Sequence, residues 1–184
     1  SEAELLAAWR SQIAGAPQRP WLIEETILAN LLLGDPSAVD TRLWEVLAEV
    51  ELDDVVKALP DGLNTRLGEH GAGLSAGQRA RLGLARVLVS ERPWVVLDEP
   101  TAHLDAATER VIVRVLQRLA ETRGVIVVAH RPEIVAVADQ VIALSAPVAT
   151  EPGTAAADEP AAASVQRPVE SRRRTPDATL EPSR

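Results

Sequence analysis

Residues 74–78, Leu-Ser-Ala-Gly-Gln, are of types that could receive a phosphate group. Ser75 can cap a helix that starts at Ala76, and Gly77 keeps a side chain away from the point where the helix N-terminus would meet an anion. A Ser-x-Gly sequence at a helix start is most often only a cap. This segment alone therefore leaves a structural and a phosphate-binding interpretation open.

A second segment whose residues could do chemistry follows 20 residues later, at Trp94–Pro100. Its apolar run predicts a buried strand that ends in two adjacent carboxylates, Asp98 and Glu99. Such a pair could hold Mg²⁺ and orient an attacking water beside a nucleotide, although most strands that end in Asp-Glu simply reach solvent. Together the two segments favour nucleotide hydrolysis.

The two segments and their neighbours resemble the ATP-binding cassette (ABC) ATPases. Residues 74–78 resemble the signature LSGGQ, with Ala76 in place of its first Gly, and Val95–Glu99 resembles the Walker B strand. Thr101–Asp105 resembles the D-loop. The resemblance covers about residues 10–145. It implies an α/β, P-loop NTPase-like ABC ATPase core with a parallel sheet, plus a helical signature subdomain.

The resemblance also implies a role for each matching residue. Asp98 would hold Mg²⁺ through water, and Glu99 would polarise the attacking water. Gln18 in the Q-loop would touch the Mg²⁺, and Gln18 and His130, the H-switch residue, would sense the γ-phosphate. The remaining cofactor-binding residues would be those of the signature and the D-loop: Ser75, Ala76, Gly77, Gln78 and Asp105.

Gln18 and His130 each have a plainer interpretation. Gln18 could be a solvated residue of a surface turn, and a lone His after a strand is more often structural than catalytic. The order of strand 93–98, helix 106–121 and strand 125–129 predicts a right-handed βαβ unit of a parallel sheet. Because the carboxyl ends of both strands then share one edge, we expect His130 to lie near the two carboxylates.

The chain is expected to have four parts. Residues 1–18 would be a remnant of the ATPase core up to the Q-loop, and 19–89 the helical subdomain with X-loop and signature. Residues 90–145 would be the ATPase core with Walker B, D-loop and H-switch. Residues 146–184 hold six of the 13 Pro and few large apolar residues, which predicts a disordered tail.

Composition excludes several other classes of function. The net charge of −8 and the absence of Tyr and Phe argue against a nucleic-acid partner. The absence of Cys removes thiol chemistry and disulfides. No apolar run reaches the length of roughly 18 residues that a membrane-spanning helix needs, so we expect a soluble polypeptide.

The sequence lacks the phosphate cradle G-x-x-x-x-G-K-[ST]. Its only Lys is Lys57, which no Gly-rich run precedes, and it contains no Met. We therefore expect the chain to be the rear two-thirds of a cassette whose front third lies outside these residues.

The resemblance implies part of an exporter that binds ATP and Mg²⁺, since the X-loop-like stretch 65–71 with Glu69 is typical of exporters. Its partners would be a second cassette and a transmembrane domain, upstream in the same parent polypeptide, at the cytoplasmic face of the membrane. Residues 98–112 and 127–144 look most like thiol-reductant exporters linked to cytochrome bd assembly (CydC/CydD type), which would export cysteine or glutathione.

Two other functions stay open. The chain could be a truncated cassette without ATPase activity that acts only as an interaction module, because it has no P-loop. A non-transport ABC-type ATPase of chromosome maintenance would need a coiled coil before the signature and a charge suited to DNA, and the sequence has neither.

Overall fold

The computed structural model describes residues 2–144 and 164–166. The chain divides into two compact units, residues 1–137 (unit 1) and 138–184 (unit 2), and each is described by itself. Of the predicted disordered tail, the structure describes only Ser164–Gln166. The rest of that prediction lies outside the described residues.

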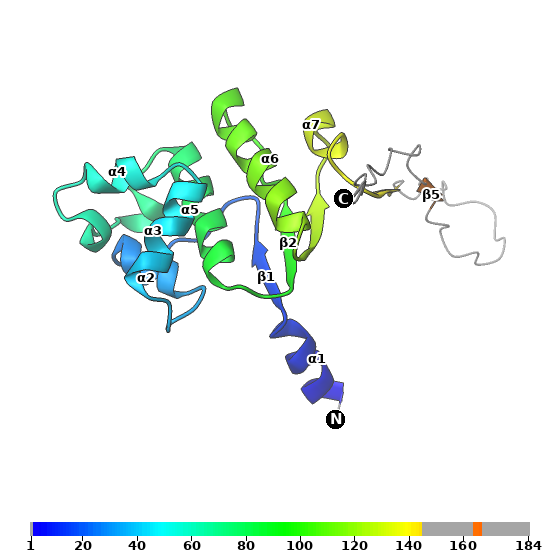
Figure 1. Cartoon of the computed structure of the whole chain (residues 1–184), viewed down its shortest axis with the longest axis horizontal. Coiled ribbons are helices and arrows are strands. Elements are labelled where there is room, and N and C mark those ends of the chain that lie inside the picture. The colour runs from blue at the N-terminus through cyan, green and yellow to red at the C-terminus, as the bar shows by residue number, and fades with distance from the viewer. Residues whose placement is uncertain (1, 145–163, 167–184) are drawn as a thin grey trace, which may run out of the picture. The chain divides into compact units, whose positions relative to one another are not determined.

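A parallel sheet of three strands forms the centre of unit 1 (Figure 1). The strands are β1 (Ile13–Ala16), β2 (Trp94–Asp98) and β3 (Gly124–Val128), in the spatial order β1-β2-β3. Asp98 lies beside Val128 in the register, so neighbouring strands end at the same edge. The predicted parallel sheet is confirmed, and the residues that follow its strands are brought together.

Two long helices pack in the core with this sheet. Helix α5 (Ala76–Val89) buries an apolar face that includes Leu84, Val87 and Leu88, and α6 (Ala106–Ala120) buries Ile112, Val115, Leu116 and Leu119. The periodicity of these apolar residues is the reason that both segments are helical, since burial of one face stabilises each helix. Helix α6 connects β2 to β3 and completes the predicted βαβ unit.

Short helices form the part of unit 1 between β1 and α5. In chain order they are α2 (Ile27–Leu32), α3 (Asp40–Glu49), α4 (Asp53–Lys57) and the 3₁₀ turns η1 (Gly62–Asn64) and η2 (Glu69–Gly71). Helix α3 ends at Glu49, and Glu51, two residues later, adopts a left-handed backbone with φ 55°. This part packs on α5 through α2 and α3 and carries the loop that leads to residues 74–78.

Two further helices lie elsewhere in unit 1: α1 (Glu2–Arg10) before β1 and α7 (Pro132–Val135) after β3. Within unit 2, β4 (Val141–Ala143) pairs in antiparallel register with β5 (Ser164–Gln166). The domain boundaries expected from the sequence stay predictions.

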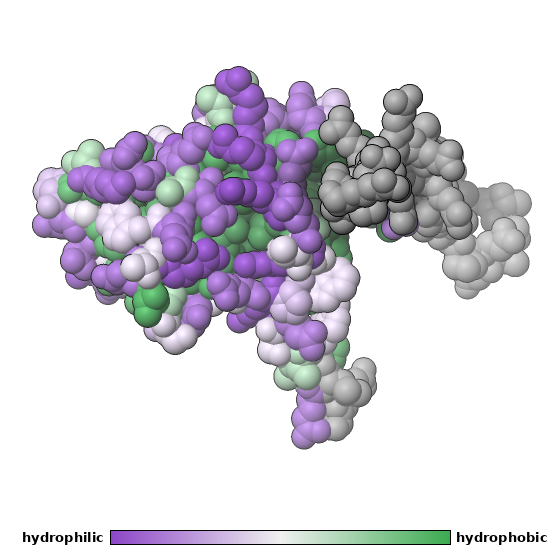
Figure 2. Space-filling view, viewed as in Figure 1, coloured by the Kyte–Doolittle hydropathy of each residue, from purple (hydrophilic) through white to green (hydrophobic). Residues whose placement is uncertain are grey.

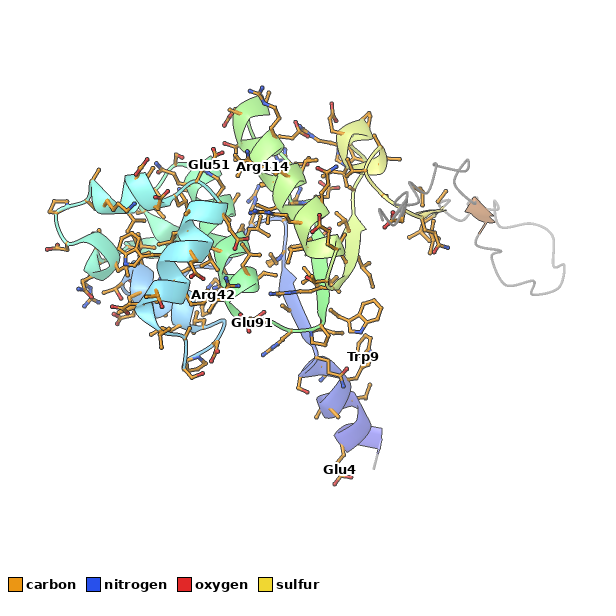
Figure 3. All side chains as sticks on the ribbon, in the orientation of Figure 1. Glu4, Trp9, Arg42, Glu51, Glu91 and Arg114 are labelled. Carbon is orange, nitrogen blue, oxygen red and sulfur yellow. The ribbon has the colours of Figure 1, made fainter. Side chains whose placement is uncertain are left out.

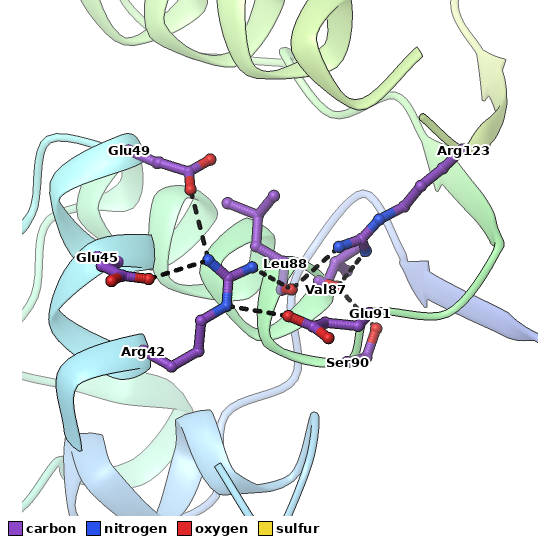
Figure 4. A network of polar contacts seen from close by, with 8 residues as sticks. All are labelled: Arg42, Glu45, Glu49, Val87, Leu88, Ser90, Glu91 and Arg123. Carbon is purple, nitrogen blue, oxygen red and sulfur yellow. Dashed lines mark hydrogen bonds and ion pairs between the residues drawn. The ribbon is translucent and has the colours of Figure 1, made fainter. Parts of the chain in front are cut away.

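Arginines connect the short helices to the rest of unit 1. Arg42 of α3 and Arg123 both donate to the Leu88 carbonyl near the end of α5, and Arg42 also forms ion pairs with Glu49 and Glu91 (Figure 4). Positive side chains at a helix C-terminus satisfy carbonyls that have no partner inside the helix. Arg42 and Arg123 thus connect the end of α5 to the short helices and to the segment before β3.

A second arginine bridge joins α6 to the end of α3. The Arg114 guanidinium lies 2.5 Å from the Glu51 carboxylate, and Figure 3 shows the two side chains at the same place. More than half of each side chain is exposed, so this pair contributes at most about 1 kcal/mol.

On the face drawn in Figure 2, hydrophilic residues cover most of the surface over the short helices. Among the described residues, no helix is both long and apolar enough to cross a membrane.

Candidate functional site

The Glu99 carboxylate lies between two side chains that come from the ends of the other two strands. Gln18 follows β1, and its Nε2 donates to Glu99 Oε2 at 2.9 Å. His130 follows β3, and its Nδ1 lies 3.1 Å from Glu99 Oε1. Residues 81 and 31 positions away in the sequence thus meet on one carboxylate. The expectation that His130 lies near the end of β2 is confirmed.

The backbone holds Glu99 in an unusual conformation. Its φ of 44° lies in the left-handed region, which residues with a side chain rarely adopt. The conformation is fixed because the Glu99 N–H donates to the Val128 carbonyl at 2.8 Å and the Glu99 carbonyl accepts from Ala102 at 3.0 Å. Such backbone strain is concentrated at functional sites. Here it turns the carboxylate toward Gln18 and His130.

Asp98, one residue earlier, has an exposed side chain that makes no hydrogen bond with the described residues. Within these residues no three His, Asp or Glu side chains form a metal cage. Mg²⁺ at a nucleotide site uses one or two carboxylates, keeps several waters and takes its other ligands from phosphates. A single free carboxylate beside Glu99 and the Gln18 amide fits that pattern and does not fit a metal site made by the protein alone.

Helix α5 fixes the segment that carries Gln18. At Gly83, an added Cβ would come within 2.6 Å of the Pro20 ring, so α5 and this segment touch directly. Arg86 of the same helix donates to the Trp21 carbonyl at 2.9 Å. The two contacts, one turn apart on α5, set where the chain after β1 runs and therefore where the Gln18 amide can reach.

The start of α5 is closed by a capping box. Ser75 Oγ accepts from the Gln78 N–H at 3.2 Å, and Gln78 Oε1 accepts from the Ser75 N–H at 2.8 Å. This reciprocal pair satisfies two backbone donors that the helix leaves free. Ser75 caps the helix as expected, whereas the Gln78 side chain folds back on its own helix. Their binding of a nucleotide stays a prediction, as does that of Ala76 in the first turn.

Gly77 has a second function that sequence reasoning missed, because it lies against Thr108 of α6. An added Cβ at Gly77 would lie 2.8 Å from Thr108 Oγ1. Thr108 is buried, and its hydroxyl donates to Asp105 Oδ2 at 2.8 Å, so the side chain cannot swing away without losing a bond. Gly77 therefore lets the starts of α5 and α6 approach each other closely.

We expect Gly77→Ala to destabilise the chain. An extra methyl in a well-packed contact costs roughly 1–3 kcal/mol, which outweighs the gain of at most about 1 kcal/mol from replacing Gly by Ala in a helix. Urea unfolding of Gly77→Ala with and without Thr108→Ala measures the contact. With Thr108→Ala the substitution should become neutral or stabilising, and an equal cost in both backgrounds would show that the two helices do not touch there.

Asp105 caps α6. Its Oδ1 accepts from the Ala107 and Thr108 N–H groups, both at 2.9 Å. These bonds and the Thr108 hydroxyl, with Thr108 contributing most, hold the pKa of the Asp105 carboxyl below its usual value. Because the folded-state pKa is lowered, the stabilisation by Asp105 is present at neutral pH and is lost as the pH falls through that lowered pKa. The nucleotide-binding role of Asp105 stays a prediction.

The chain is similar to transporters in sequence and in structure. Residues 2–102 match the family model of ABC transporters. The sequence is 38% identical over 149 residues to the ABC transporter ATM1 of Toxoplasma gondii, covering 81% of this chain and 13% of the relative. It is 40% identical over 149 residues to the ATP-dependent lipid A-core flippase of Burkholderia orbicola, covering 81% of this chain and 25% of the relative.

Among solved structures, the fold matches that of a bacterial Atm1-family ABC exporter with ATP bound. The TM-score is 0.70 at 31% identity, over 76% of this chain and 24% of that one. The chain therefore spans about a quarter or less of the length of the relatives it matches.

Proposed function

Because the chain belongs to the ABC transporter family, we propose that it supplies the hydrolytic end of an ATP-binding cassette in an exporter. The observation that supports this most is the Glu99 carboxylate, held by Gln18 and His130 where the three parallel strands end. In an open parallel sheet, ligands bind outside the carboxyl ends of the strands. The position of the cluster at this edge supports the proposal that it acts on a bound nucleotide.

In this proposal Glu99 orients and deprotonates the attacking water. A carboxylate that accepts hydrogen bonds on both oxygens keeps its orientation, and positioning together with charge stabilisation is most of what phosphoryl transfer requires. Gln18 keeps its amide oxygen available for the water or for Mg²⁺, and the exposed Asp98 carboxylate would hold Mg²⁺. The ion would neutralise charge that develops on the phosphates. His130 would report on the γ-phosphate through its contact with Glu99.

A second cassette and a membrane domain are the proposed partners. The start of α5 carries the signature residues, and the N-terminus of a 14-residue helix favours an anion. We propose that it completes the ATP site of a partner cassette, and that the assembly works at the cytoplasmic face of the membrane with a transmembrane domain in the same parent polypeptide.

The molecule that such an exporter would carry is proposed here only at the level of the family. The thiol reductants cysteine and glutathione follow from the sequence resemblance alone. The relatives compared with this chain carry other descriptions, among them a lipid A-core flippase, a heavy metal tolerance protein and a multidrug export protein. The coarser proposal of an ABC exporter is the one that these relatives support.

A specific observation favours a second function, a module that interacts with a cassette but binds no nucleotide itself. The only lysine of the 184 residues, Lys57, lies in α4, where its Nζ is 2.7 Å from Asp53 Oδ2 and 5.8 Å from the centre of the Trp44 ring. It is engaged in the short helices, so it does not serve the Glu99 cluster as the lysine of a phosphate cradle.

Two measurements test two statements: that the chain alone binds no ATP, and that it associates with a complete cassette when ATP is present. We expect the 184-residue chain alone to bind no MgATP by calorimetry at micromolar concentration, because backbone N–H groups and a lysine of a P-loop supply most of the affinity. With a complete cassette of a relative as partner, weak association that requires ATP is expected by sedimentation. The control is Ser75→Arg, which blocks the signature end of α5. Stoichiometric MgATP binding by the chain alone would contradict the proposal.

A further inference from the structure

A largely buried ion pair includes the chain neighbour of His130 and has no part in the roles given so far. Glu109, in the first turn of α6, is 8% exposed, and its Oε2 accepts from Arg131 Nη1 at 2.7 Å. Arg131 is the residue that follows His130, and two-thirds of its side chain is buried. The pair thus ties the residue next to His130 to the helix that starts after Asp105.

The pair is costly to break. Glu109 Oε1 is buried and has no hydrogen-bond partner, so Arg131 is the only side chain that compensates the carboxylate among the described residues. The N-terminal end of α6 also favours a negative charge in its first turn. Removal of one partner from a buried pair leaves an uncompensated charge, which is far less favourable than the intact pair. Arg131 is therefore held firmly in place.

Besides its contact with Glu99, the His130 side chain has few contacts that fix its position. Its side chain is 71% exposed, so packing does not select its orientation. The His130 backbone makes no hydrogen bond with the part of the chain that the structure describes; the nearest backbone bonds are those of Val128 to Glu99 and of Arg131 to α7. Apart from its contact with Glu99, the imidazole must take its position from the residues on either side of His130 in the chain.

We propose that Glu109 and Arg131 are positioning residues that hold His130 against Glu99. The Arg131 side chain anchors the chain to α6 after β3 has ended. The cap of α6, Asp105, accepts a hydrogen bond from Thr108, and Thr108 lies against Gly77 of α5. The ion pair thus links the switch histidine to the helix on which the signature end of α5 packs. Its role in catalysis rests on the proposed function, but the contact itself does not.

The test is nuclear magnetic resonance on the full chain, without nucleotide. The chain has three His residues, and His130→Gln identifies the ring signals of His130. Glu99→Gln should shift these signals because Glu99 touches the ring. In the Arg131→Met and Glu109→Gln backgrounds we expect that shift to fall below about half of its original size, because His130 is then no longer held against Glu99. Arg131→Lys should keep more of it than Arg131→Met.

Arg114→Met is the matched control, because it removes another arginine ion pair of α6, an exposed one that joins Arg114 to Glu51 and not to Arg131. It should leave the response of His130 to Glu99→Gln unchanged, and the signals of His70 and His103 should not move in any variant. Glu109→Gln keeps the shape of the side chain, so it tests the proposal even if Arg131→Met does not fold. An undiminished response in Glu109→Gln, or in a folded Arg131→Met, would overturn the proposal, as would the absence of any response to Glu99→Gln in the otherwise unsubstituted chain. If the His130 response is intact but the chain does not support ATP hydrolysis within a complete cassette, the proposed function alone is contradicted.

Discussion

Glu99→Gln is expected to lower the steady-state ATPase rate by about 10²–10⁴-fold, the usual contribution of a general base. The assay uses a chimera of the Burkholderia orbicola lipid A-core flippase in which the aligned segment of this chain replaces that of the relative. The amide keeps the shape of Glu99 and its hydrogen bond with Gln18, but it cannot take a proton from the attacking water. ATP binding to the chimera should therefore persist.

Glu133→Gln is the matched control for this loss, because Glu133 is an exposed carboxylate of α7 near the same edge of the chain's sheet. It should leave the rate within a factor of about two, as surface substitutions usually do. A Glu99→Gln chimera that turns over ATP close to the unsubstituted rate would show that another group activates the water.

Leu97→Ala should destabilise the full chain by about 2–5 kcal/mol, the range for truncating a buried Leu. Leu97 is fully buried in β2, one residue before Asp98, and it packs in the core under the strand ends that carry the site. The cavity left behind is expected to loosen the end of β2. Urea unfolding followed by circular dichroism measures the change.

Ile126→Ala on the neighbouring strand provides the comparison. Ile126 is 52% exposed, so its truncation removes little buried area and should cost well under half as much as Leu97→Ala. Equal costs for the two substitutions would mean that the end of β2 is not the buried centre of the sheet.

The position of His130 could be predicted from the sequence because it depends on topology. Two apolar strands joined by an amphipathic helix form a parallel pair, and residues after parallel strands meet at one edge. The start of α5 could also be predicted from the sequence, because Ser75 precedes an apolar helical pattern. Local patterns of this kind need no knowledge of distant contacts.

The function of Gln78 in this structure had a signal that the prediction did not use. Ser-x-x-Gln before an apolar run is the sequence pattern of a capping box, and it accounts for the side chain of Gln78 folding back toward Ser75. The resemblance directed attention to nucleotide binding instead. Both functions can belong to one residue, but only the cap follows from local sequence.

Thr108, Glu109 and Arg131 could not be predicted from the sequence. Their importance lies in contacts across long stretches of chain: Thr108 with Gly77, and Glu109 with Arg131. Such pairs depend on how closely two helices approach and on which face of α6 is buried. A single sequence shows a threonine and a glutamate in a first helical turn, which are ordinary there.

The ATPase rate of the unsubstituted chimera tests most directly that Gln18, Glu99 and His130 form the hydrolytic end of a cassette. We predict Mg²⁺-dependent hydrolysis within about an order of magnitude of the parent flippase, because the segment from this chain would supply the water-activating carboxylate and both of its partners. A chimera that folds, assembles and binds MgATP but releases no phosphate above the rate of its Glu99→Gln variant would contradict this assignment.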